Sequence, residues 1–194
     1  MSTGFVLRDE GRDGAPVALV LPGRGYDVDQ PLLARARAVL LARGWRVRSL
    51  AWEGPPPTST REVRDVGERL CESAPRLLVA KSLTSRLLPL AVERGLPGCW
   101  LTPLLHEEEV RAAVSAVAGR AAGAPALLVG GAADESWDSS VARASGHRVV
   151  EVPGADHSLE VPGRPEATAA ALALVGQELA AFSDRVVAGS GSPP

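Results

Sequence analysis

The sequence alternates between short apolar runs and longer segments with helical periodicity, and this alternation restricts the possible folds more than any other feature. Several of the apolar runs are continuous, which is typical of strands buried on both faces of a parallel sheet. Strands separated by helices predict a parallel sheet with helices on both faces. The strands expected from these runs are 17–21, 46–51, 76–80, 98–101, 126–130 and 148–152, with a short edge strand at 5–7.

Helical segments fill the intervals between the predicted strands. The segment 31–43 places Leu32, Ala36 and Leu40 on one stripe, and Gly44 follows it as a helix terminator. Ser59 or Thr60 is expected to cap the next helix. The remaining helices are expected at 60–72, from 82 or 83 to 94, at 107–120, at 137–145 and at 165–182.

The expected fold class is therefore α/β, with one three-layer α/β/α domain whose mostly parallel sheet has six to seven strands. A chain of 194 residues can bury a sizeable core but leaves no room for a second large domain. The domain is expected to span residues 1–185, and the small, polar residues near the end predict a disordered tail at 186–194. In an open α/β sheet, ligands bind beyond the carboxyl ends of the strands, so a functional residue should follow a strand.

Composition excludes several classes of partner. The formal net charge is −2 and no long block of one sign occurs, so neither nucleic acid nor a membrane surface is expected as a partner. Cys71 and Cys99 lack the spacing of metal ligands and are expected to be reduced thiols, so no metal is expected. Neither a signal-peptide core nor an apolar run of about 18 residues is present, so we expect a cytoplasmic location.

Ser82 lies where the predicted strand 76–80 runs directly into a helix. In a nucleophile elbow a serine occupies such a turn, and small residues two positions before and after it relieve crowding. Those positions hold Ala80 and Thr84, and the β-branched threonine weakens the match to Gly-x-Ser-x-Gly. The Leu83 N–H is expected to be the first donor to a developing oxyanion. The alternative role of Ser82 is that of a helix cap.

A glycine-rich turn, Pro-Gly-Arg-Gly-Tyr, follows the predicted strand 17–21. Such a turn lets a backbone N–H approach a substrate carbonyl, and the N–H of Arg24 is the expected second oxyanion donor. Pro22 stands where the usual pattern has histidine. An ordinary strand-to-helix turn is one alternative. A dinucleotide-binding loop is another, but its third glycine is replaced by Val28 and no phosphate-binding lysine follows.

An acidic residue follows the predicted strand 126–130. Asp134 lies in the loop just past this strand, where a carboxylate could orient an imidazole and stabilise its charged form. Asp138 is the rival for this role, and the alternative for Asp134 is to cap the helix that follows.

A histidine follows the predicted strand 148–152. His157 suits the role of general base because the pKa of an imidazole lies near neutrality. His147 precedes the same strand and should lie at the opposite end of the sheet. His106 follows the strand 98–101 but does not fit the order of a triad as its base. An ordinary loop position is the alternative for His157.

These three side chains occur in the order Ser82, Asp134, His157, which is the order found in α/β-hydrolases. With its Ala-Lys-Ser-Leu, Gly-Gly-Ala-Ala-Asp-Glu-Ser-Trp-Asp and Ala-Asp-His-Ser-Leu segments, the chain resembles the α/β-hydrolase superfamily over residues 15–182, and most of all its compact bacterial branch. The resemblance implies a sheet of eight strands or slightly fewer, an acyl-enzyme mechanism and no cofactor. Thr84 and Pro22 depart from the general pattern.

The function implied by the resemblance is that of a serine hydrolase, of carboxylesterase or thioesterase type, acting on a small-molecule acyl substrate. A non-catalytic protein of the same fold that binds a small molecule or a protein partner is the alternative. A lyase or dehalogenase-like activity is disfavoured, because dehalogenases generally use aspartate as the nucleophile. The sequence assigns no oligomeric state.

The connection between the strand 98–101 and the next helix is short, and many hydrolases carry an inserted cap domain about here. Its near absence predicts no large cap and an exposed, shallow site. Lys81 and Arg24 lie near the expected site and could favour an acidic substrate group, with structural or solvated roles as the alternative. The candidate walls of the substrate pocket, each of which could instead be a core residue, are Tyr26, Trp52, Leu104, Trp137 and Leu159.

Overall fold

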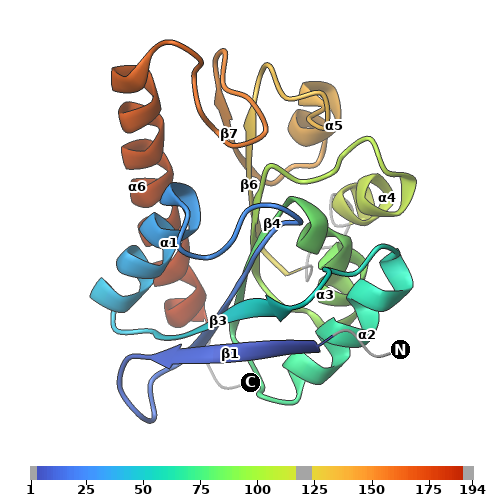
Figure 1. The fold of residues 1–194 in the computed structure, drawn as a ribbon, viewed down its shortest axis with the longest axis vertical. Coiled ribbons are helices and arrows are strands. Elements are labelled where there is room, and N and C mark those ends of the chain that lie inside the picture. The colour runs from blue at the N-terminus through green and yellow to red at the C-terminus, as the bar shows by residue number, and fades with distance from the viewer. Residues whose placement is uncertain (1–3, 117–123, 190–194) are drawn as a thin grey trace.

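A computed structural model of the chain describes residues 4–116 and 124–189. These residues form a seven-stranded sheet in the order β1-β3-β2-β4-β5-β6-β7 (Figure 1). Every neighbouring pair is parallel except β1 and β3, which pair antiparallel. The strands are β1 (Gly4–Glu10), β2 (Val17–Leu21), β3 (Arg46–Glu53), β4 (Leu77–Lys81), β5 (Gly98–Leu101), β6 (Ala126–Gly131) and β7 (Arg148–Val152).

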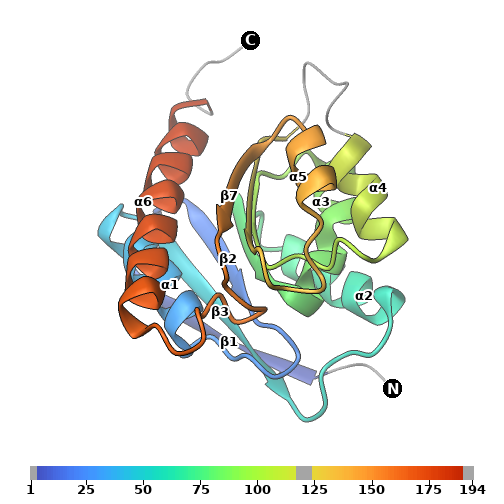
Figure 2. The same cartoon turned by 90° about the horizontal axis from the view of Figure 1, so that it is seen from above.

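Helices cover both faces of the sheet and make the three layers that the alternation predicts (Figure 2). One face carries α1 (Pro31–Ala42) and α6 (Pro165–Gly189), which pack against each other. The other face carries α2 (Thr60–Cys71), α3 (Leu88–Arg94), α4 (Glu108–Ala116) and α5 (Ser139–Ala144), and the 3₁₀ helix η1 (Ser82–Leu87) joins β4 to α3. The expected α/β fold class is confirmed.

Each face of the sheet has its own hydrophobic core, because side chains along a strand alternate between the two faces. In β2, Ala18 and Val20 pack under α1 and α6, whereas Leu19 and Leu21 pack under the opposite helices. All four side chains are fully buried. The continuous apolar runs are therefore strands covered on both sides, as the sequence predicts.

Strand and helix boundaries mostly follow the expected ranges. The strands 17–21, 98–101 and 148–152 have the expected limits. The edge strand β1 is longer than 5–7 because it pairs with β3 along its whole length, from Gly4 opposite Glu53 to Glu10 opposite Val47. Of the two cap candidates for α2, Ser59 is the cap: its side chain accepts the Glu62 N–H, and the Glu62 carboxylate accepts the Ser59 N–H.

Three expectations about helices are corrected. The segment from Ser82 to Arg94 is not one α-helix: Leu88 N–H bonds to the Ser85 carbonyl as in a 3₁₀ turn, and Pro89 has no N–H to offer the same carbonyl. The helix expected at 137–145 begins at Ser139, because Asp138 caps it. The expected tail loses residues 186–189, which belong to α6. Residues 190–194, and the expected end of α4 at 120, lie outside the described residues.

The packing of β6 leads to a prediction about stability. Leu128 is fully buried, whereas Leu174 on α6 is 41% exposed. We expect Leu128→Ala to lower the free energy of unfolding by about 2–5 kcal/mol, because it opens a cavity beside the sheet. The same change at Leu174 should stay within about 0.5 kcal/mol of the parent protein. Urea denaturation measures both variants, and equal losses would contradict the placement of the core.

Candidate active site

Ser82 occupies a strained turn at the carboxyl end of β4. Its φ angle is 52°, in the left-handed region that residues other than glycine rarely enter. Such strain persists only where the surrounding structure enforces it, and it is frequent at functional sites. Ser82 is half-buried, so the residue keeps partial access to solvent.

Thr84 holds this turn in place, which explains the departure from glycine at this position. Its side chain is buried, and its hydroxyl oxygen accepts the Lys81 N–H at 3.1 Å. The same hydroxyl lies 3.2 Å from the Leu21 carbonyl oxygen, to which it can donate. Thr84 therefore links the carboxyl end of β2 to the turn that carries Ser82.

The structure brings Ser82, His157 and Asp134 together in one hydrogen-bonded chain. His157 Nε2 lies 2.7 Å from Ser82 Oγ, and His157 Nδ1 lies 2.8 Å from Asp134 Oδ2. The three residues come from the loops after β4, β6 and β7, which end at the same edge of the parallel sheet. With Nδ1 protonated and facing the carboxylate, Nε2 can accept the serine proton.

Asp134 is the buried member of this chain, with a side chain only 2% exposed. Burial alone raises the pKa of this carboxyl. Hydrogen bonds from His157 and the Ser136 N–H, with the positive charge of Lys81, outweigh burial, and the pKa of Asp134 lies below its usual value. Asp134 is therefore ionised at neutral pH and can orient the imidazole.

The rival residues lie elsewhere. Asp138 accepts the N–H groups of Ser140 and Val141 and caps α5. His147 precedes β7 and thus lies at the end of the sheet opposite Ser82, as expected. His106 is an exposed residue in the turn before α4, where its carbonyl accepts a hydrogen bond from Arg111.

The glycine-rich turn after β2 lies directly against Ser82. A Cβ atom placed on Gly23 would lie 3.4 Å from the Ser82 Cβ. The Gly23 N–H donates to the Tyr26 carbonyl at 3.0 Å, and Trp52 Nε1 donates to the Gly23 carbonyl at 3.3 Å. Arg24 is the next residue along the chain, and its guanidinium donates to the Pro57 carbonyl at 3.3 Å. Gly23 and Ser82 are thus in close contact. The predicted oxyanion donors directly follow them in the sequence: Arg24 follows Gly23, and Leu83 follows Ser82.

A surface hollow of about 370 Å³ opens beside this turn. Its volume lies within the range of small-molecule sites. Three of the expected residues, Arg24, Tyr26 and Trp52, line it. Leu104 is half-buried and does not line it; its N–H donates to Ser85 Oγ at 3.1 Å, which ties the turn after β5 to η1.

Two expected pocket walls are core residues instead. Trp137 packs its ring over Gly130, which has no side chain to oppose it, and its Nε1 donates to Glu151 at 2.8 Å. Leu159 is fully buried in the core beneath α1 and α6. Trp137 lies three residues after Asp134 and Leu159 two residues after His157. Their burial therefore anchors the two loops of the site to the hydrophobic cores.

Lys81 is buried rather than directed at a substrate, which corrects the expectation that it could favour an acidic group. Its Nζ donates to the His157 carbonyl at 2.9 Å and to Thr102 Oγ1 at 3.1 Å. Burial lowers the pKa of Lys81 to about 8, although the carboxylates of Asp134 and Asp156 oppose this shift. Sequence reasoning missed Thr102, whose only signal was its position directly after a strand.

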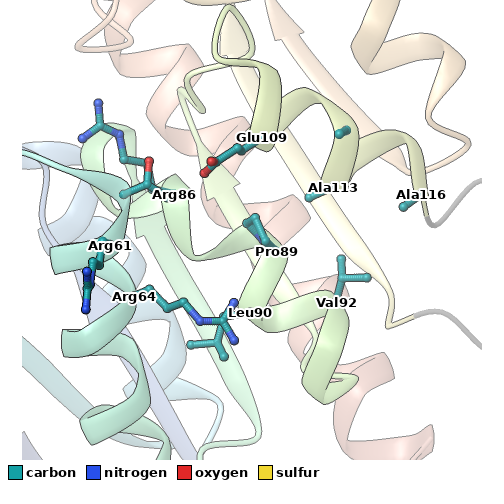
Figure 3. A pocket seen from close by; sticks show the side chains of 11 residues that line it. Arg61, Arg64, Arg86, Pro89, Leu90, Val92, Glu109, Ala113 and Ala116 are labelled. Atoms are coloured by element: carbon teal, nitrogen blue, oxygen red, sulfur yellow. The ribbon is translucent and has the colours of Figure 1, made fainter.

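A larger hollow, of about 620 Å³, lies between α2, α3 and α4 (Figure 3). None of Ser82, Asp134 and His157 lines it. Two of its arginines are already paired: Arg64 with Glu68 and Glu93, and Arg86 with Glu107. This hollow shares no lining residue with the one beside the glycine-rich turn, whose Gly23 lies against Ser82.

Metal-binding clusters and membrane-spanning helices are both absent from residues 4–116 and 124–189. Within these ranges, no group of three or more His, Cys, Asp or Glu side chains could hold a metal ion. No helix there has both the length and the apolar character needed to cross a membrane.

The sequence matches no protein-family model, and the search of curated proteins gives no significant relative. Solved structures do match. Est1E from Butyrivibrio proteoclasticus, solved with ferulic acid bound, has a TM-score of 0.71 at 13% identity over 96% of each chain. The esterase domain of a Rhodothermus marinus protein has a TM-score of 0.64 at 17% identity, over 95% of this chain and 99% of that one.

A third match concerns the connection after β5. A serine hydrolase without a lid from Xanthomonas campestris has a TM-score of 0.61 at 14% identity, over 93% of this chain and 88% of that one. Residues 102–107 alone join β5 to α4 in this chain. The seven-stranded sheet, this short connection and these matches show that the chain has the α/β-hydrolase fold, and residues 4–116 and 124–189 contain no cap domain.

Proposed function

We propose that this protein is a serine hydrolase that cleaves an ester or thioester through an acyl-enzyme intermediate. The observation that carries the proposal is the continuous hydrogen-bonded chain from Ser82 Oγ through the His157 imidazole to the Asp134 carboxylate. The fold shared with an esterase domain and a lidless serine hydrolase supports it.

The reaction begins with proton transfer from Ser82 to His157 Nε2 as Oγ attacks the substrate carbonyl carbon. The resulting imidazolium then protonates the leaving alcohol or thiol, which leaves the acyl group on Ser82. His157 next takes a proton from water, and the hydroxide attacks the acyl carbon. The imidazolium returns its proton to Ser82 Oγ, and the carboxylic acid departs.

Two electrostatic contributions accompany these steps. The ionised Asp134 stabilises the imidazolium that forms twice in each turnover. The N–H groups of Leu83 and Arg24 are the proposed donors to the tetrahedral oxyanion, and each such donor contributes about 3 kcal/mol in related mechanisms. The hollow lined by Arg24, Tyr26 and Trp52 lies beside Ser82 and is the proposed seat of one substituent of the substrate carbonyl.

Removal of the nucleophile provides the first test. We expect Ser82→Ala to reduce hydrolysis of an activated acyl ester by about 10⁶-fold, because no other group at the site can form the acyl intermediate. The melting temperature should change little, since the substitution removes one half-buried hydroxyl and relieves no packing. Ser115→Ala on the exposed surface of α4 is the matched control and should keep full activity. Full activity in Ser82→Ala would end the proposal.

Covalent labelling separates an enzyme from a non-catalytic protein of the same fold. A fluorophosphonate should modify Ser82 in the parent protein and leave Ser82→Ala unmodified, as peptide mass spectrometry would report. A parent protein that resists labelling would favour the binding alternative. Acyl esters and thioesters of graded chain length, each with the Ser82→Ala control, then distinguish carboxylesterase from thioesterase activity.

The two neighbouring aspartates allow a matched test of the acidic residue. Asp134→Asn should lower kcat by about 10⁴-fold, because the amide favours the wrong imidazole tautomer. Asp138→Asn should keep its activity and its helix, since asparagine is also a good N-cap. Steady-state kinetics and circular dichroism measure the pair. A larger loss of kcat in Asp138→Asn than in Asp134→Asn would reverse the assignment.

A further inference from the structure

Lys81 connects three loops at the carboxyl edge of the sheet. It ends β4, immediately before Ser82, and the residue is 1% exposed. Its ammonium donates to Thr102 Oγ1 after β5 and to the His157 carbonyl after β7. The same nitrogen lies 4.4 Å from the centre of the Tyr26 ring, in the turn after β2. Two hydrogen bonds and one cation–π contact therefore hold the ammonium.

Backbone strain gathers at the segments that this ammonium joins. Among the described residues, four other than glycine have a positive φ, and three of them belong here: Ser82 at 52°, Thr102 at 44° and Leu159 at 63°. A positive φ is especially costly for a β-branched residue such as threonine. Residues persist in such conformations when the surrounding contacts determine them. The hydrogen bonds of Lys81 to Thr102 and to the His157 carbonyl are contacts that help to hold these segments in their conformations.

We propose that Lys81 is a positioning residue that holds the His157 backbone so that the imidazole stays between Ser82 and Asp134. This inference rests on the proposed function, in which that alignment transfers the serine proton. It assigns Lys81 no contact with substrate, because the residue is buried and its ammonium is held by Thr102, the His157 carbonyl and the Tyr26 ring. A lysine holds this place well because it offers three donors, whereas an uncharged amide offers two.

The charge of Lys81 is balanced locally. The carboxylates of Asp134 and Asp156 act on it electrostatically. Asp156 also accepts the N–H groups of Ser158 and Glu160, which shapes the loop around His157. The ammonium therefore acts electrostatically on the acidic residue of the proposed triad and donates a hydrogen bond to the loop that carries the base.

The test compares variants that remove this anchor with one that only destabilises the fold. Lys81→Met keeps the apolar stem and removes the ammonium, and Thr102→Val removes the hydroxyl partner at the same shape. Thr102→Ser restores that hydroxyl and is the conservative control. Leu128→Ala lowers stability at a core position outside the site. The measured quantity is the rate constant of fluorophosphonate labelling of Ser82 per folded molecule.

We expect Lys81→Met and Thr102→Val to label about tenfold to 100-fold more slowly than the parent protein, because small displacements of reacting groups cost rate of this order. Thr102→Ser and Leu128→Ala should label at close to the parent rate. Labelling of Lys81→Met or Thr102→Val at the Leu128→Ala rate would overturn the proposal. If Lys81→Met does not fold, the matched pair at Thr102 decides the question.

A second readout does not depend on catalysis. The Nδ1 proton shared by His157 and Asp134 should give a deshielded proton NMR signal in the parent protein and in Thr102→Ser. The signal should broaden or vanish in Lys81→Met and Thr102→Val, as the imidazole loses its fixed place. An unchanged signal in these two variants would refute the positioning role. A parent protein that shows the signal but resists labelling would refute the proposed function alone.

Discussion

The hydrogen bond between the Ser82 hydroxyl and the His157 imidazole depends on the direction of the strands. Ser82 follows β4 and His157 follows β7, and β5 and β6 lie between these strands in the sheet. Only because all four strands are parallel do their carboxyl ends share one edge. The two hydrophobic cores and the helices on both faces stabilise this arrangement, because they bury the strands and so fix the position at which each loop begins.

Much of this arrangement could be predicted from the sequence, because its signals are local. Continuous apolar runs gave the strands, and the position of Ser82, Asp134 and His157 after three of them predicted that their side chains would meet, as they do. The roles of these residues in catalysis stay predictions. The sequence predicts His147 at the opposite end of the sheet, where the structure places it. The sequence leaves Asp138 as a rival of Asp134, and the structure shows it as a helix cap.

The rest could not be predicted because it depends on contacts between distant segments. Thr84 looked like a departure from the elbow pattern, yet its hydroxyl joins the turn to the end of β2. From the sequence, Lys81 could either favour an acidic substrate group or have a structural or solvated role. Only the fold places its ammonium beside Thr102 and the His157 carbonyl. Trp137 and Leu159 follow the same strands as Asp134 and His157, and sequence position alone does not separate a loop residue that faces outward from one that faces the core.

The short connection from β5 to α4 also affects how molecules reach and leave the site. The His157 side chain is 39% exposed, so the imidazole meets bulk water without any segment having to move. Under the proposed chemistry, deacylating water arrives by simple diffusion and products escape without gating. Turnover would then be limited by bond rearrangement rather than by conformational opening. Under the same proposal, we expect weak discrimination among leaving groups, because the exposed side of His157 places little protein surface around the departing half of the molecule.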